Sequence, residues 1–160
     1  MSLKNIIELM KNAVHSEIDS QGFYQEAVKC TKRDEAKKMF KRLIDDEKRH
    51  EKILTERYTG LTKDPLPSME PHKKRIDMAR KIVKGRTTEV DALKIAINKE
   101  RWTHNNYLEM ADNVKDKDLE DVLQLLAQDE LGHEQILVAE YRAFTNQPFD
   151  EYELDLYVRE

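Results

Sequence analysis

Two short segments of the sequence place a carboxylate and an imidazole at helical spacing. Glu47-Lys48-Arg49-His50 and Glu130-Leu131-Gly132-His133 are both Glu-x-x-His units. Residues three apart lie on one face of an α-helix, so each unit would present both groups in the same direction. Carboxylates and imidazoles are ligands for iron, manganese and related metals.

The two units belong to an internal repeat. A shift of 83 residues superposes acidic, aromatic and apolar positions: Glu17 on Glu100, Tyr24 on Tyr107, Glu47 on Glu130, His50 on His133 and Leu43 on Leu126. The chain therefore repeats a structural unit together with its chemistry.

Four segments show apolar residues at alternating steps of three and four, which predicts helices with one buried face. We expect these helices over residues 3–30 and 35–58, from about 88 to 114, and from 119 until Pro148. Asp34 is the expected N-cap of the second helix, and Gly60 its expected end. Only four glycines and four prolines, with 38% charged and 39% hydrophobic residues, favour an all-α chain.

Residues 59–86 form a long connection, with three prolines and a short amphipathic helix expected over Lys73–Lys84. It is long enough to cross a bundle, so the helices on either side of it should run parallel. The predicted fold is an all-α, antiparallel four-helix bundle of two repeated helical hairpins joined by a long helical crossover. We expect residues 1–146 to form it and residues 147–160 to be a tail packed on the bundle or in an oligomer contact.

Equal helix lengths predict that the repeated acidic residues meet. Glu17 and Glu47 each lie about 15 residues from the first turn, or about 22 Å along a helix, and Glu100 and Glu130 have the same spacing around the second turn. Four carboxylates and two imidazoles in one core layer would be costly unless they were paired. Two divalent cations would balance the four negative charges. The alternative is a buried ion-pair network without metal.

The pattern resembles the ferritin-like superfamily, and within it the diiron domain of the rubrerythrin family, over about residues 3–144. The resemblance implies two iron ions, with manganese possible. It also implies six ligands: Glu17, Glu47, His50, Glu100, Glu130 and His133. Glu47 and Glu130 would bridge the metals.

The resemblance also implies which residues form hydrogen bonds to the metal ligands. Tyr24 and Tyr107 would donate hydrogen bonds near the site, and Asp46 and Asp129 would orient the histidines across the bundle. Rubrerythrins typically carry a further carboxylate ligand where this chain has Thr103, whose repeat partner is Ser20.

Rubrerythrins usually also carry a four-cysteine rubredoxin domain, whereas this chain has one cysteine. The implied function is therefore reduction of hydrogen peroxide, or oxygen, with electrons from a separate donor such as a rubredoxin. The alternatives are a ferroxidase or iron-handling protein, a manganese catalase-like enzyme, and a metal-binding module without catalysis.

The remaining features limit location and partners. The net charge of −4 gives no reason to expect nucleic acid, and no apolar run is long enough for a membrane span or signal peptide. We expect a cytoplasmic protein, with a homodimer as its assembly. His104 is either close to the metals or a hydrogen-bonded core histidine, and Trp102 is expected at an interhelical or subunit contact. His15 and His72 should face solvent.

Overall fold

The computed structural model describes residues 2–75, 77 and 89–149. This part of the chain contains no strand, and its long helices are α1 (Leu3–Cys30), α2 (Asp34–Thr62), α4 (Glu89–Asn113) and α5 (Lys117–Thr145). The predicted all-α class is confirmed.

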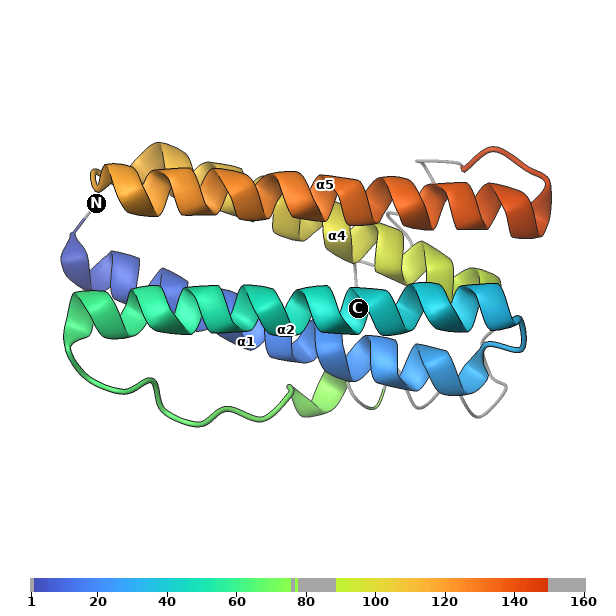
Figure 1. The fold of residues 1–160 in the computed structure, drawn as a ribbon, viewed down its shortest axis with the longest axis horizontal. Helices are drawn as coiled ribbons and strands as arrows, with labels where there is room; N and C mark the ends of the chain where they lie inside the picture. Colours follow the sequence, from blue (N-terminus) through green and yellow to red (C-terminus); the bar gives the residue numbers. More distant parts are fainter. Residues whose placement is uncertain (1, 76, 78–88, 150–160) are drawn as a thin grey trace.

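The helices form two antiparallel hairpins that pack face to face (Figure 1). Short turns join α1 to α2 and α4 to α5, while α1 also contacts α4 and α2 also contacts α5. The crossover leaves α2 at one end of the bundle, and α4 begins at the other end, so α2 and α4 run parallel (Figure 1). The predicted topology is therefore confirmed.

The helix ends show two side-chain caps that were not predicted and two corrections to the predicted ends. Ser2 and Asp116 cap α1 and α5 by accepting hydrogen bonds from backbone N–H groups. Asp34 is not the N-cap of α2 but its first residue, where a carboxylate favours the positive end of the helix dipole. Gly60 does not end α2, which continues to Thr62 before Lys63 takes a left-handed conformation with φ 62°.

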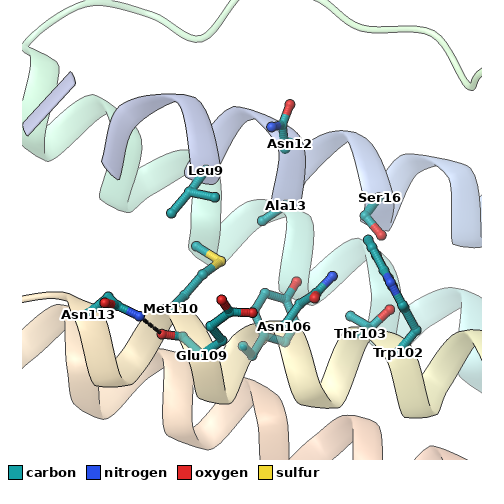
Figure 2. A pocket seen from close by; sticks show the side chains of 11 residues that line it. Leu9, Asn12, Ala13, Ser16, Trp102, Thr103, Asn106, Glu109, Met110 and Asn113 are labelled. Carbon is teal, nitrogen blue, oxygen red and sulfur yellow. Dashed lines mark hydrogen bonds between the residues drawn. The ribbon is translucent and has the colours of Figure 1, made fainter. Parts of the chain in front are cut away.

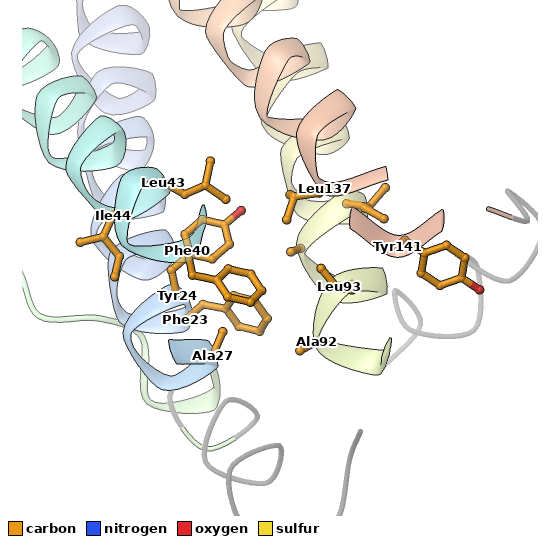
Figure 3. Packing of buried hydrophobic residues seen from close by; sticks show 12 residues of the cluster. Phe23, Tyr24, Ala27, Phe40, Leu43, Ile44, Ala92, Leu93, Leu137 and Tyr141 are labelled. Carbon is orange, nitrogen blue, oxygen red and sulfur yellow. The ribbon is translucent and has the colours of Figure 1, made fainter. Parts of the chain in front are cut away.

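Buried apolar side chains form two clusters, one toward each end of the bundle. The first includes Phe23, Tyr24, Phe40 and Leu137 (Figure 3). The second cluster centres on other buried residues: Met10, Val14, Leu54, Tyr107, Leu123 and Leu126. Side chains from both hairpins contribute to each cluster, so burial of apolar surface holds the hairpins together.

The crossover is attached to α1 through a buried aspartate. Asp19 accepts hydrogen bonds from the His72 backbone N–H at 2.7 Å and contacts its imidazole at 2.6 Å. The Arg75 guanidinium lies 3.2 Å from the same carboxylate. The His72 ring also stacks on His15, with 3.6 Å between the ring centroids. These contacts hold residues 70–75 against the middle of α1.

Several predictions fall at the edge of the described residues. Residues 73–75 are helical, as expected for the start of the crossover helix, but most of Lys73–Lys84 lies outside the described part. The expected start of α4 at about residue 88 also lies outside it. After α5, the Phe149 ring packs edge-on against the Tyr141 ring, with 5.1 Å between the ring centroids, and the tail beyond Phe149 lies outside the described residues.

None of the described helices has the length and apolar character required to cross a membrane.

The contacts of Asp19 lead to a first prediction. Asp19→Ala leaves the His72 N–H and Arg75 without their buried acceptor, so we expect the free energy of unfolding to fall by about 1–3 kcal/mol. Limited proteolysis should also cut the crossover faster. Asp45→Ala, at an exposed position on α2, is the matched control. Equal cleavage rates in the two variants would show that Asp19 does not hold the crossover.

Candidate metal centre

All six residues predicted as ligands lie together in the middle of the bundle. One carboxylate comes from each helix, and the two imidazoles come from α2 and α5. The carboxylates of Glu17, Glu47, Glu100 and Glu130 and the His50 side chain are fully buried, and His133 is 4% exposed. The equal arm lengths of the two hairpins bring these positions to the same height, as the sequence predicted.

The six side chains form two overlapping groups. In one group, ligand atoms of Glu17, Glu47, His50 and Glu130 all lie within 4.8 Å of one another. The second group contains Glu47, Glu100, Glu130 and His133. Glu47 and Glu130 are common to both, which is the arrangement that two bridging carboxylates would require. The donor sets of oxygen with one imidazole nitrogen each suit iron or manganese.

Asp46 and Asp129 each contact the Nε2 atom of a histidine on the other hairpin. The Nε2 atom of His50 lies 3.2 Å from Asp129 Oδ2, and that of His133 lies 3.1 Å from Asp46 Oδ2. Arg49 also donates to Asp129 at 3.0 Å. With Nε2 engaged, each imidazole presents Nδ1 to the carboxylates, and its ring orientation is set.

Two buried tyrosines hydrogen-bond the outer carboxylates, which are those of Glu17 and Glu100, each present in one ligand group only. These hydrogen bonds also run from one hairpin to the other. Tyr24 on α1 donates to Glu100 on α4, and Tyr107 on α4 donates to Glu17 on α1. Burial and the adjacent negative charges raise the pKa of both phenols well above their usual range. Both hydroxyls therefore stay protonated and act as donors.

The inward-facing atoms of the site provide a test of whether a metal fits. Among the described residues, six buried atoms of this layer lack a hydrogen-bond partner: Glu17 Oε2, both Oε atoms of Glu47, His50 Nδ1, Glu100 Oε2 and Glu130 Oε1. Unpaired buried polar atoms are rare and costly. Since all six belong to the two ligand groups, the residues fit a pair of divalent cations.

The shared carboxyl groups hold protons when only protein atoms surround them. Burial and the charges of Glu17 and Glu100 raise the pKa of Glu47 well above its usual range. Burial, with the charges of Glu100 and Glu17, raises the pKa of Glu130 to about 8. Glu130 is therefore mainly protonated at pH 7 in the absence of a cation, and the raised pKa of Glu47 favours its protonated form in the same way.

The outer carboxyl groups behave in the opposite way. Burial alone would raise the pKa of Glu17, but contacts with the protonated Glu47 and with His50 lower it to about 2. The pKa of Glu100 is lowered too, because the contact with His133 outweighs burial. Glu17 and Glu100 are thus ionised.

The imidazoles become positively charged in this environment. Burial alone would lower the pKa of His50, but the contacts with Glu130 and Glu17 raise it far above 7. Contacts with Glu100 and Glu130 likewise outweigh burial and raise the pKa of His133 to about 10. Two imidazolium ions then balance the two ionised carboxylates.

Sequence reasoning missed one charged residue beside the site. Lys99 is 9% exposed and donates a hydrogen bond to Ser20. Burial would lower its pKa, but the charges of Glu100 and other nearby carboxylates raise it. Thr103, at the position where rubrerythrins typically carry a further carboxylate, and its repeat partner Ser20 are buried, and both hydroxyls donate to backbone carbonyls four residues earlier. In the 83-residue repeat, Lys99 is equivalent to Ser16. This difference between the two halves was the feature of the sequence that could have drawn attention to Lys99.

The other candidate residues lie apart from the six. His104 contacts the Ala127 carbonyl at 2.6 Å, and Trp102 is 52% exposed. The expectation that His15 and His72 simply face solvent was incomplete, since they group with Asp19 closely enough to hold a cation. Because Asp19 already contacts His72 and Arg75, we assign this group to attachment of the crossover.

The protonation pattern predicts how metal binding depends on pH. The raised pKa values of Glu47, Glu130, His50 and His133 favour protons that a cation must displace, so binding of divalent cations should release protons at pH 7. Metal affinity should therefore rise with pH. Calorimetric titration with Mn²⁺ in buffers of different ionisation enthalpy measures the release. Binding that releases no protons would contradict this assignment.

Comparisons with known proteins support the fold. A hypothetical protein from Pyrococcus furiosus has a TM-score of 0.70 at 24% identity, and the match covers 91% of this chain and 93% of that one. A two-domain protein from Anabaena variabilis, with DJ-1/ThiJ/PfpI-like and ferritin-like domains, has a TM-score of 0.72 at 19% identity. That match covers 94% of this chain but 42% of the other protein. These identities show a likeness of fold alone.

The family comparison goes further than the likeness of fold. No curated protein matches the sequence. The Rubrerythrin family matches residues 8–141, a span that includes all four long helices in whole or in part and all six buried carboxylates and imidazoles. The chain belongs to the rubrerythrin family.

Proposed function

We propose that the protein is a diiron oxidoreductase that reduces hydrogen peroxide to water with electrons from a separate donor protein. The observation that carries the proposal is the pair of buried ligand groups sharing Glu47 and Glu130. This arrangement suits two cations held side by side, and membership of the rubrerythrin family supports iron as the metal. When bound, a pair of ferrous ions can supply the two electrons that cleavage of a peroxide O–O bond requires.

The protein groups have separate roles in this proposal. Glu17 and His50 would hold one metal, Glu100 and His133 the other, with Glu47 and Glu130 between them. The reaction consumes hydrogen peroxide, two electrons and two protons and yields two water molecules. The apolar clusters at both ends of the layer limit access of bulk water, so that only small molecules would reach the centre.

The electron donor would be a second protein. The chain has one cysteine, Cys30, which cannot build a four-cysteine iron site. A rubredoxin-type protein is the class of donor that we propose, and each turnover would need two one-electron deliveries. A homodimer in the cytoplasm is the assembly and location that we propose.

Peroxide consumption by the iron-loaded protein tests the function. Protein reconstituted anaerobically with ferrous iron should bind about two iron ions and oxidise them on addition of peroxide, which absorbance and peroxide assays measure. Glu47→Gln removes a charge shared by both groups and should lower both iron content and peroxide consumption. Glu56→Gln, exposed on the same helix, is the control. Oxidation no faster than that of free ferrous iron would refute the proposal.

The aspartates behind the histidines give an independent prediction. Asp46→Asn keeps the shape of the side chain but removes the charge next to His133 Nε2, so we expect metal affinity or activity to fall by about 10–100-fold. The adjacent exposed Asp45→Asn variant is the matched control. Metal titrations that give the same affinity for both variants would show that Asp46 does not position His133.

A further inference from the structure

A pocket lies between α1 and α4, on the side of the bundle away from the histidines' aspartate partners. It has a volume of about 340 Å³. Its walls are formed by Leu9 and Ala13 of α1 and by Trp102, Asn106 and Met110 of α4. Figure 2 shows Leu9 and Met110 pointing toward one another across this space.

The two halves of the repeat carry different residues at the positions that line this pocket. The 83-residue shift pairs Asn106 with Phe23 and Met110 with Ala27. Phe23 is only 3% exposed and packs with Tyr24 and Ala96 in the first apolar cluster (Figure 3). At equivalent positions of the repeat, one half therefore has a buried aromatic ring and the other has an amide on the pocket wall.

The pocket adjoins one of the two ligand groups. Tyr107 lines its wall, and the Tyr107 hydroxyl donates to Glu17. The equivalent tyrosine, Tyr24, donates to Glu100 but is enclosed by Phe23 and Phe40, with ring centroids 5.6 and 5.8 Å away. The pocket thus lies next to the tyrosine that contacts Glu17, whereas the tyrosine that contacts Glu100 packs against two phenylalanines.

The size and lining of the pocket indicate the class of ligand. A water molecule occupies about 30 Å³ in the liquid, so the pocket is several times larger than hydrogen peroxide needs. Its volume is instead in the range of sites for small organic molecules, about 300–1,000 Å³. Apolar side chains and the Asn12 and Asn106 amides suit an apolar body with one polar end. Glu109 is the one charged residue on the wall, and its carboxylate disfavours anions.

We propose that this pocket binds the apolar part of a small organic hydroperoxide, which is then a substrate of the centre. The inference rests on the proposed function and extends it to a class of substrate. In the reaction, the O–O bond breaks and an alcohol and one water molecule form. Two protons are consumed, and the external donor protein supplies two electrons.

The sole tryptophan provides a direct binding measurement. Trp102 is the only tryptophan in the chain and lines the pocket, so its fluorescence should change saturably when metal-free protein binds 2-phenylpropan-2-ol, the alcohol product of cumene hydroperoxide. Asn106→Phe introduces the side chain that the other half of the repeat carries at this position, and should abolish this change. Asn105→Phe adds the same ring at the neighbouring exposed position and should retain it.

Turnover by the iron-loaded protein completes the test. We expect Asn106→Phe to lower the ratio of kcat/KM for cumene hydroperoxide to that for hydrogen peroxide by about tenfold or more, and Asn105→Phe to leave it unchanged. Ala13→Leu narrows the pocket from α1 and should act like Asn106→Phe if that variant misfolds.

The possible results separate this inference from the proposed function. No saturable fluorescence change in the wild-type protein, or reduction of hydrogen peroxide but not of cumene hydroperoxide, would overturn the substrate assignment alone. Failure to reduce either oxidant would overturn both proposals. Binding that Asn106→Phe and Ala13→Leu leave intact would place the ligand elsewhere and also overturn the inference.

Discussion

The structure depends on neutralising four carboxylates that the helices carry into the core. Each ion taken out of water costs several kcal/mol, even after relaxation. Protein groups provide partial compensation through two phenol hydroxyls, two imidazoles and Lys99. The inward atoms of Glu47 remain without a hydrogen-bond partner among the described residues. The carboxylates of this layer therefore require further positive charge for neutralisation, and either protons or metal cations can supply it.

The rest of the bundle keeps this layer in place. Apolar clusters lie on both sides of it. The aspartate and tyrosine side chains that contact the ligands reach from one hairpin to the other. Asp129 contacts His50, and Tyr24 donates to Glu100. Ligand geometry and hairpin packing are thus coupled, because separating the hairpins would break the hydrogen bonds that orient the ligands. A metal that binds the folded site would in turn stabilise the bundle.

The fold and the six buried polar residues could be predicted because both depend on helical periodicity and on the repeat. Glu17 and Glu47 occupy stripe positions where apolar residues belong, and the second repeat has glutamates at the same positions. Features set by tertiary contacts were less accessible. The end of α2 moved beyond Gly60 because Leu61 packs on the core and Lys63 adopts the left-handed conformation. The role of Asp19 depends on the path of the crossover, which no local pattern specifies.

The difference between Phe23 and Asn106 shows what joining two hairpins in one chain makes possible. Two identical α1–α2 hairpins related by a twofold axis would place a phenylalanine on both faces, and two α4–α5 hairpins would place an asparagine on both. When both hairpins belong to one chain, the sequence of each hairpin can differ from that of the other. Equivalent ligand positions at the centre can then coexist with two different outer faces, one with a pocket beside Asn106 and the other with a buried Phe23.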